Sequence, residues 1–162
     1  MAGNVFDQDI IKFIKEKYKL LIGDKTAEEI KIEFANVYNP DKKKKMEVRG
    51  RDLITGLPST IEIFENETEE ALSESLQKII KAATNVLEQT PPELSADIVE
   101  KGVILTGGGS MLTGLVPLLK DKLKIPVFIA DTPLTCVAEG TGVLLDDVRS
   151  LCLLYTSDAA DD

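Results

Sequence analysis

Histidine and tryptophan are absent from this sequence, and cysteine occurs only as Cys136 and Cys152. A chain without histidine cannot form a Ser-His or Cys-His catalytic pair, and it loses the commonest nitrogen ligand of zinc sites. Two cysteines are too few for a disulfide framework, which favours a reducing, cytoplasmic setting. Any chemistry is therefore expected from carboxylates, lysines and backbone dipoles.

Long apolar runs and excess positive charge are also missing. No apolar run approaches the roughly 18 residues of a membrane-spanning helix, and the residues after Met1 do not form a secretory signal. The 28 acidic and 19 basic residues give a net charge of -9, which argues against nucleic acid or an anionic membrane as the main partner. The lysine run at 42–45 is accordingly interpreted as a solvated turn.

The first part of the chain predicts two helices and a β hairpin. Apolar residues recur at helical spacing over 9–22 and 26–38, and Thr26 with Glu29 has the pattern of a capping box. Asp7 and Asp9 are expected at the start of the first helix, where carboxylates stabilise the N-terminal dipole. Alternating apolar residues at 46–48 and 61–63 then predict two antiparallel strands.

The second part alternates helices and strands. The pattern predicts, in order, a helix from Asn66 to about residue 90, a helix at 95–101 ended by Gly102, a buried strand at 103–106, a one-turn helix followed by a helix with Pro117 in its first turn, a strand at 125–130 and a helix at 135–147. This order favours a βαβ unit with parallel strands. Gly140 and Gly142 are expected to permit close helix packing, Cys136 to be a buried small hydrophobe, and Asp131 to cap the last helix rather than face a ligand.

Three successive glycines, Gly107, Gly108 and Gly109, stand where the strand at 103–106 meets a helix. A strand, a glycine cluster and a helix start form a typical setting for nucleotide binding, because bare backbone and free N–H groups can approach the ligand. The pattern G-x-x-x-x-G-K-[ST] does not fit, because no Lys-Ser or Lys-Thr pair follows the glycines. The pattern G-x-G-x-x-G does not fit either, because Leu112 occupies the position of its third glycine. Spacing alone leaves a nucleotide loop and a tight structural turn both open.

Four separate blocks resemble one known family. They are VRGRDLITGLP at 48–58, EQTPPEL at 88–94, LTGGGSMLTGL at 105–115 and IPVFIADTPLTCVAEGTG at 125–142. Together, over residues 3–148, they resemble the MreB/Mbl family of bacterial actin homologues. The resemblance implies the α/β actin-like ATPase (RNase H-like) fold, and only its second half. Residues 1–65 would be a smaller α+β outer subdomain with two helices and a hairpin, and 66–148 an inner βαβ subdomain. The tail at 149–162 does not look like the family's ending from Leu151 onward and is interpreted as a cloning or sequencing scar.

The same resemblance implies a nucleotide site with two walls. Gly107, Gly108, Gly109, Ser110 and Met111 would form one wall against the adenosine, and Glu28, Glu29, Ile30 and Lys31 the facing wall. The spacing is compatible, because Glu28 and Lys31 are three residues apart and so are neighbours on a helix surface. Without the resemblance, this pair is better explained as a solvated ion pair. We expect no metal ligands and no catalytic residues in this chain.

The function implied by the resemblance is that of a fragment of an ATP-binding filament protein that determines rod cell shape and organises cell-wall synthesis. Its cofactor would be ATP, held as Mg-ATP in the full-length family, whose phosphate and metal site is expected outside this chain. We therefore expect weak nucleotide binding and no measurable ATP hydrolysis by this chain alone. Expected partners are further copies in a filament and membrane-anchored morphogenesis proteins, without nucleic acid and without direct membrane contact by this half, in a cytoplasmic filament that associates with the membrane.

Two other members of the superfamily remain as alternatives. Half of a sugar or acetate kinase would be expected to add a substrate-binding acid and loop insertions. Half of a chaperone ATPase would be expected to continue into a peptide-binding β domain. The compact blocks of this sequence leave little room for either addition.

Overall fold

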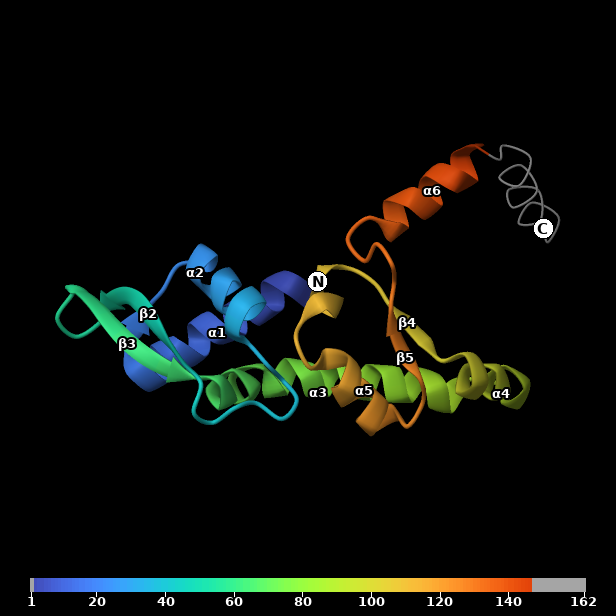
Figure 1. Ribbon diagram of the computed structural model, residues 1–162, viewed down its shortest axis with the longest axis horizontal. Coiled ribbons are helices and arrows are strands. Elements are labelled where there is room, and N and C mark those ends of the chain that lie inside the picture. Colours follow the sequence, from blue (N-terminus) through green and yellow to red (C-terminus); the bar gives the residue numbers. More distant parts are fainter. Residues whose placement is uncertain (1, 147–162) are drawn as a thin grey trace, which may run out of the picture.

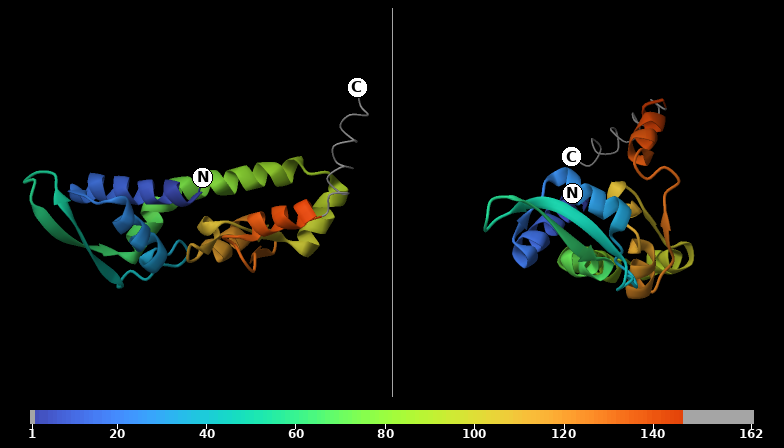
Figure 2. Two further views of the ribbon diagram at one scale, coloured as in Figure 1. Left: turned by 90° about the horizontal axis from the view of Figure 1, so that it is seen from above. Right: turned by 60° about the vertical axis from the view of Figure 1, so that its left-hand side comes forward.

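The computed structural model describes residues 2–146 as an elongated α/β molecule with two small sheets (Figure 1). The elements in chain order are α1 (Ala2–Tyr18), β1 (Leu20–Leu21), α2 (Asp24–Glu29), the π-helix η1 (Ile30–Phe34), β2 (Lys45–Asp52), β3 (Pro58–Phe64), α3 (Glu65–Gln89), α4 (Pro92–Lys101), β4 (Val103–Leu105), the 3-10 helix η2 (Gly108–Met111), α5 (Leu115–Leu123), β5 (Val127–Ile129) and α6 (Cys136–Asp146). The hairpin of β2 and β3 lies at one end, and α4 and α6 lie toward the other (Figure 2).

The first sheet is antiparallel, in the order β1-β2-β3, and confirms the predicted hairpin. Helix α1 ends earlier than predicted, because Lys19 turns the chain with a φ of 54° and Leu20–Leu21 then pairs with β2. A buried Leu20, 1% exposed, fits both helical and strand periodicity, so the sequence pattern could not separate the two. Gly50 permits this pairing, since a Cβ there would lie 2.4 Å from the carbonyl oxygen of Leu21.

The second predicted helix is divided between α2 and η1. It begins at Asp24 after the N-cap Gly23, so Thr26 is inside the helix and the predicted capping box is wrong. From Ile30 to Phe34 the helix widens to π geometry, and the chain leaves it in an extended conformation at Ala35. The predicted role of Asp7 and Asp9 is also wrong, because α1 begins at Ala2 and has no acidic residue in its first turn.

The hydrophobic core lies between α1, η1, the first sheet and the beginning of α3. Its largest fully buried side chains are those of Phe6, Ile10, Ile14, Leu20, Ile30, Val37, Val48 and Leu72, with Val127 from the second sheet. These residues come from segments that are distant in sequence, so the same burial that stabilises the molecule also fixes α1 and η1 beside each other.

Two buried carboxylates mark the start of α3. Glu67 accepts hydrogen bonds from the Phe64 N–H (2.7 Å) and the Tyr18 hydroxyl (2.7 Å), and it pairs with Lys17 at 2.6 Å. Glu65 accepts from the backbone N–H of Asp41 (2.6 Å) and pairs with Lys44 at 2.7 Å. The helix therefore starts at Glu65, one residue before the predicted Asn66, and its first turn connects α1 with the segment that precedes β2.

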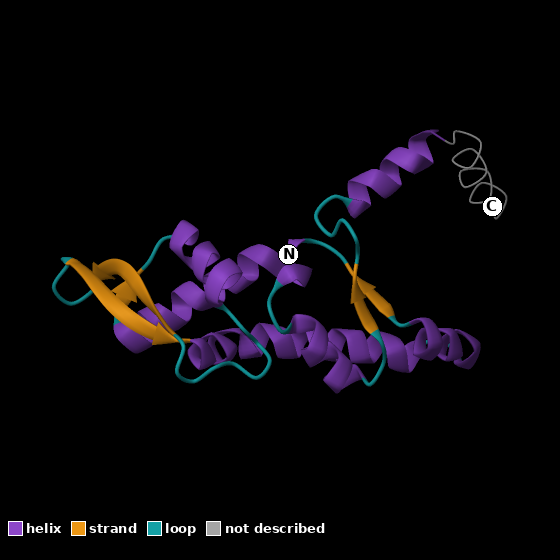
Figure 3. Cartoon of the chain, viewed as in Figure 1, coloured by secondary structure: helices purple, strands orange, loops and turns teal. Residues whose placement is uncertain are grey.

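The second sheet pairs β4 and β5 in parallel, as the predicted βαβ pattern requires (Figure 3). Helix α5 carries Pro117 in its first turn, as predicted, and contributes buried Leu115 and Leu119. The prediction that 103–106 is a fully buried strand is wrong, because the Ile104 side chain is 68% exposed.

The packing around helix α6 differs from the sequence-based prediction. A Cβ added at Gly140 or Gly142 would meet no atom within 4 Å, so the predicted close packing at these glycines is wrong. Cys136 is half-buried and its Sγ contacts the Thr106 hydroxyl, whereas Asp131 is exposed and no hydrogen bond joins it to α6 in the described chain.

Within residues 2–146, no helix combines the length and apolar character that a membrane crossing requires. The predicted tail at 149–162 lies outside the described residues.

Candidate functional site

A cavity of about 480 Å³ lies where three parts of the chain meet: the start of α1, the α2–η1 helix and the glycine cluster. Its lining consists of Gly3, Asn4, Phe6, Glu28, Lys31, Ile32, Gly108, Gly109, Met111, Leu112 and Leu134. The three parts are far apart in sequence, and the core described above holds them together. The cavity is larger than the neighbouring one of about 360 Å³ and combines polar with apolar lining.

The glycine cluster forms one wall through its backbone. Gly107 has a φ of 84°, a conformation that favours glycine, and its N–H donates to the carbonyl oxygen of Pro133 at 2.6 Å. The Gly107 carbonyl oxygen accepts from both the N–H (3.1 Å) and the hydroxyl (2.6 Å) of Ser110, which closes the short η2 turn. A Cβ on Gly108 would lie 3.2 Å from the Leu134 side chain. The cluster thus satisfies the demands of a tight turn and also leaves bare backbone at the cavity.

The facing wall is charged and comes from α2 and η1. Glu28 and Lys31 both line the cavity, with the exposed Ile32 beside them. Lys31 does not pair with Glu28, as a simple surface ion pair would; its Nζ lies 2.8 Å from Asp7 Oδ1 and donates to the Gly3 carbonyl oxygen at 3.3 Å. The side chains of Lys31 and Asp7 are only 15% and 13% exposed. The ammonium group is therefore fixed against α1 at the edge of the cavity.

Helix α1 is a third wall that the sequence analysis missed. Gly3, Asn4 and Phe6 line the cavity, and Asp7 holds Lys31. No local signal could reveal this wall, because Asp7 sits in an ordinary helical pattern and meets Lys31 only through the packing of two distant helices. The sequence also missed Ile32, Leu112 and Leu134.

The predicted site residues divide into three groups. Glu28, Lys31, Gly108, Gly109 and Met111 line the 480 Å³ cavity together. Gly107 and Ser110 line a neighbouring cavity of about 360 Å³, although Gly108 and Gly109 border both. Ile30 is 0% exposed in the core, and Glu29 is exposed but is not among the lining residues.

A clamp holds the base of the two main walls together. The segment after η1 meets the segment after η2, where the Val37 N–H donates to the Thr113 carbonyl oxygen at 3.1 Å. Gly114, with a φ of 86°, allows this approach, because a Cβ there would lie 2.6 Å from Asn36 Oδ1 and 2.7 Å from the Tyr38 nitrogen. The distance between the charged wall and the glycine wall is therefore set by direct backbone contact.

The lining suits a flat, polar-edged ring. Ile32, Met111 and Leu134 present apolar surface, while Glu28 can accept and Lys31 can donate hydrogen bonds at the rim. Among residues 2–146, no group of three or more His, Cys, Asp or Glu side chains is placed to hold a metal ion. The geometry fits recognition of a heteroaromatic ring and adjoining hydroxyl groups, in a cavity that remains open to solvent.

Comparison with known sequences finds a matching family and relatives that belong to it. The model of the MreB/Mbl protein family matches residues 1–152. The cell shape-determining protein Mbl of Bacillus subtilis is 54% identical over 151 residues, which are 93% of this chain and 45% of that protein. The cell shape-determining protein MreB of Escherichia coli is 46% identical over 146 residues, 90% of this chain and 42% of that protein. The chain thus spans less than half the length of these curated relatives.

Solved structures agree with the sequences. The crystal structure of MreB5 of Spiroplasma citri bound to ADP has a TM-score of 0.86 and 34% identity, and the match covers 93% of this chain and 46% of that one. The structure of the same protein bound to AMPPNP gives a TM-score of 0.85. A MamK double helical filament, 24% identical, has a TM-score of 0.66 over 81% of this chain and 40% of that one, which shows the fold alone. The molecule has the α/β actin-like fold of MreB structures.

Proposed function

Because this chain belongs to the MreB/Mbl family, we propose that it acts as part of an ATP-binding, actin-like filament protein that determines rod cell shape and organises cell-wall synthesis. Within that protein it corresponds to the second half and supplies the adenosine side of the nucleotide cleft. One observation carries this proposal: Glu28 and Lys31 share a cavity with Gly108, Gly109 and Met111. Relatives crystallised with ADP and AMPPNP support the choice of ligand.

In this proposal, the adenine lies on the backbone of Gly108 and Gly109, between Met111 and Ile32. The Glu28 carboxylate accepts hydrogen bonds from ribose hydroxyls, and Lys31, oriented by Asp7, donates to an acceptor on the ring or ribose. The triphosphate and its Mg²⁺ are held by residues outside this chain. A ligand gripped on one side only binds weakly and is not activated, so the chain alone hydrolyses no ATP.

The proposed partners follow from the same family. Further copies of the whole protein form the filament, and membrane-anchored morphogenesis proteins connect it to the cytoplasmic face of the membrane. The net charge of -9 supports the absence of nucleic acid among the partners. Membership of the MreB/Mbl family takes precedence over the kinase and chaperone alternatives, which no feature of the described chain favours.

Titration with a fluorescent N-methylanthraniloyl ATP tests the nucleotide site. We expect saturable, weak binding, and we expect Glu28→Ala or Lys31→Ala to raise the Kd about tenfold, since loss of one charge-assisted hydrogen bond costs about 1.4 kcal/mol or more. Glu33→Ala is the matched control, because Glu33 is an exposed residue of η1 outside the cavity lining. Equal Kd values for all four proteins would remove the site from this cavity, and phosphate release by the purified chain would contradict the absence of hydrolysis.

A further inference from the structure

The turn η1, which brings Lys31 and Ile32 to the candidate site, has π geometry. The Ala35 N–H donates to the carbonyl oxygen of Ile30, five residues earlier, at 2.8 Å. In a regular α-helix the same N–H would donate to Lys31, four residues earlier. Single π turns are rare and occur often at functional sites. Because the π form is rarely adopted by a helix on its own, we expect a contact from outside the helix to stabilise this turn.

That contact comes from the start of α3. The chain leaves η1 into residues 35–41, which we call the strap. The Asn36 N–H donates to the Thr68 hydroxyl oxygen at 3.2 Å. The Asn36 side-chain amide (3.5 Å) and the Asp41 N–H (2.6 Å) both donate to Oε2 of Glu65. Since Thr68 and Glu65 are only 3% and 4% exposed, water does not compete for these acceptors.

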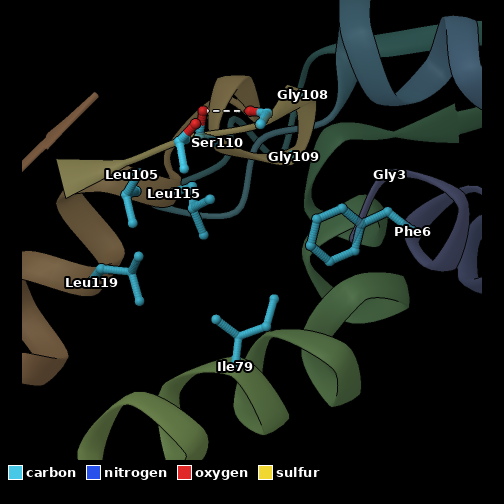
Figure 4. A pocket seen from close by; sticks show the side chains of 11 residues that line it. Gly3, Phe6, Ile79, Leu105, Gly108, Gly109, Ser110, Leu115 and Leu119 are labelled. Carbon is cyan, nitrogen blue, oxygen red and sulfur yellow. Dashed lines mark hydrogen bonds between the residues drawn. The ribbon is translucent and has the colours of Figure 1, made fainter. Parts of the chain in front are cut away.

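The strap is held on its other side too, by the segment that follows the glycine cluster. There the Val37 N–H donates to the Thr113 carbonyl oxygen at 3.1 Å. The glycine cluster is closed by a turn of its own, in which the Ser110 hydroxyl donates to the Gly107 carbonyl oxygen at 2.6 Å (dashed line in Figure 4). The glycine wall therefore keeps its shape independently of η1, whereas the charged wall depends on how η1 joins the strap.

The extra residue of the π turn decides where Lys31 and Ile32 point. Each residue of a helix turns the chain by about 100° around the axis. If η1 became α-helical, the residues before the turn would rotate by about that angle relative to the strap. Either the strap would lose its bonds to α3, or Lys31 and Ile32 would turn away from the cavity that they line.

We infer that Glu65 and Thr68 are positioning residues of the nucleotide site: their bonds to the strap select the π turn and so direct Lys31 and Ile32 into the cavity. The inference rests on the function proposed above, because it gives the two side chains a role in nucleotide binding. Neither Glu65 nor Thr68 is among the residues that line the cavity. They act only through η1, so their loss should weaken binding without removing a ligand contact.

Nuclear magnetic resonance identifies the form of the turn without any ligand. Scalar coupling across a hydrogen bond joins the donor nitrogen to the acceptor carbonyl carbon. In the wild-type 162-residue chain we expect the Ala35 nitrogen to couple to Ile30, and coupling to Lys31 instead would overturn the inference. Thr68→Val keeps the side-chain shape without the hydroxyl and should lose the coupling to Ile30. Glu65→Gln, which keeps an acceptor but not the charge, should weaken it.

Matched variants on the same helix separate this role from general stability. Glu67→Gln neutralises the other buried carboxylate in the first turn of α3, which accepts bonds from α1 and from the Phe64 N–H but, in the described chain, from no residue of the strap. Ser75→Ala removes a buried hydroxyl about two turns further along, which is bonded to Asp9. Both controls should keep the coupling to Ile30 and the wild-type Kd for the fluorescent ATP.

Binding of the fluorescent ATP tests the consequence for the site. We expect Thr68→Val and Glu65→Gln each to raise the Kd about tenfold, the size expected when Lys31 loses one charge-assisted hydrogen bond to the ligand. Unchanged coupling in a variant would show that its residue does not select the π turn, and lost coupling with an unchanged Kd would show that the turn does not position Lys31. Equal increases in the controls would assign the effect to stability. Each of these results overturns the inference.

Failure of the inference can be told apart from failure of the proposed function. A wild-type chain that binds no nucleotide would contradict the proposed function. The coupling between Ala35 and Ile30 needs no ligand, so it would still decide whether Glu65 and Thr68 select the π turn.

Discussion

At the scale of single residues, Asp7 has the most direct consequence for ligand binding. The Asp7–Lys31 pair, with 2.8 Å between Oδ1 and Nζ, holds a lysine at the rim of the candidate site. An amide at position 7 keeps the shape but loses the charge, so the lysine regains rotamer freedom worth up to about 2 kcal/mol. We expect Asp7→Asn to raise the Kd for the fluorescent ATP by about tenfold without changing the far-UV circular dichroism spectrum.

The control for Asp7→Asn is the same substitution at Asp24. Asp24 is exposed at the start of α2, where it accepts a hydrogen bond from Gln8 (3.1 Å) and lies outside the cavity lining. If Asp7→Asn and Asp24→Asn bind nucleotide equally well, then Asp7 does not position Lys31. A combined Asp7→Asn and Lys31→Ala variant should bind no more weakly than Lys31→Ala, because Asp7 is proposed to act only through the lysine.

Glu67 is the residue whose charge matters most for stability. Its side chain is 8% exposed and receives bonds from Lys17, Tyr18 and the Phe64 N–H. Glu67→Gln weakens these bonds, and hydrogen bonds to a charged group contribute about 1.5 to 3 kcal/mol. We expect a loss of about 2 kcal/mol in the free energy of unfolding, measured by urea denaturation at pH 7. Glu74→Gln should have no measurable effect, since Glu74 and its partner Lys78 are both solvent-exposed.

The same carboxylate predicts how stability depends on pH. Burial favours a higher pKa for Glu67, but the bonds from Lys17, the Phe64 N–H and Tyr18 outweigh it and hold the pKa below its ordinary value of 4.5. A lowered pKa in the folded state adds stability above pH 4.5, and this contribution is lost as the pH falls through the folded value. The wild type should therefore lose more stability than Glu67→Gln in urea titrations below pH 4.5. Parallel acid profiles for the two proteins would contradict this.

The pKa of Tyr18 shifts upward, whereas that of Glu67 shifts downward, so the contribution of Tyr18 to stability is lost at alkaline pH. Burial, together with its hydrogen bond to Glu67, raises the pKa of the Tyr18 phenol from 10.0 to about 12. The folded state therefore favours the neutral phenol, and its stability contribution is complete below pH 10.0 and lost as the pH rises to about 12. Tyr18→Phe should be less stable than the wild type at pH 7 but should lose less between pH 10.0 and 12, as followed by urea denaturation.

At the scale of elements, the clamp between the two cavity walls depends on Gly114. Alanine at this position is strained by the φ of 86°, and its Cβ would lie 2.6 Å from Asn36 Oδ1 and 2.7 Å from the Tyr38 nitrogen. Since the nearest backbone atom cannot move without shifting the wall, we expect Gly114→Ala to cost about 3 kcal/mol and to weaken nucleotide binding.

Gly56→Ala is the control for Gly114→Ala, because it separates the cost of a positive φ from the cost of a steric clash. Gly56 has a φ of 74°, but a Cβ there would meet no atom within 4 Å. It should therefore show only the conformational cost, about 1 kcal/mol, and should leave the nucleotide Kd unchanged. Equal losses for the two variants would mean that the clamp contributes nothing beyond the unusual backbone angle.

The elements themselves were largely predictable from local patterns. The hairpin, the parallel βαβ unit and the helix with Pro117 in its first turn were all confirmed. The errors occur where tertiary contacts decide between local alternatives. Leu20–Leu21 continues the helical apolar pattern but pairs as a strand, and η1 widens where a regular helix was expected. No spacing rule contains the information that Gly50 brings a second strand to within contact of Leu21.

At the scale of the whole molecule, the resemblance to the MreB/Mbl family predicted a nucleotide site at the glycine cluster, which hydrophobic periodicity alone could not predict. Local analysis left the glycine cluster equally open to a turn and to a nucleotide loop, and the structure shows that Gly107 and Ser110 close a turn while Gly108 and Gly109 face a cavity. Membership of the MreB/Mbl family is confirmed. Which half the chain represents, the division at residue 65 and the nucleotide contacts stay predictions. The third wall from α1 was unpredictable because it arises only when the core is assembled.

The distribution of buried residues over the molecule predicts an uneven stability. The core joins α1, η1, β2 and the beginning of α3, whereas α4 has no buried residue and the side chains of Val137 and Val143 on α6 are about 70% exposed. Helices of 10 and 11 residues are marginal in water without packing, so α4 and α6 should open locally at little cost.

Hydrogen exchange of the 162-residue chain, resolved by electron-transfer fragmentation, measures this gradient directly. We expect amides of α1 and the first half of α3 to exchange only through global unfolding, and amides of α4 and α6 to exchange within about tenfold of unfolded rates. Adding urea below the midpoint separates the two classes, because only exchange through global unfolding accelerates with denaturant. Protection of α6 equal to that of α1 would show that its apolar side chains are covered.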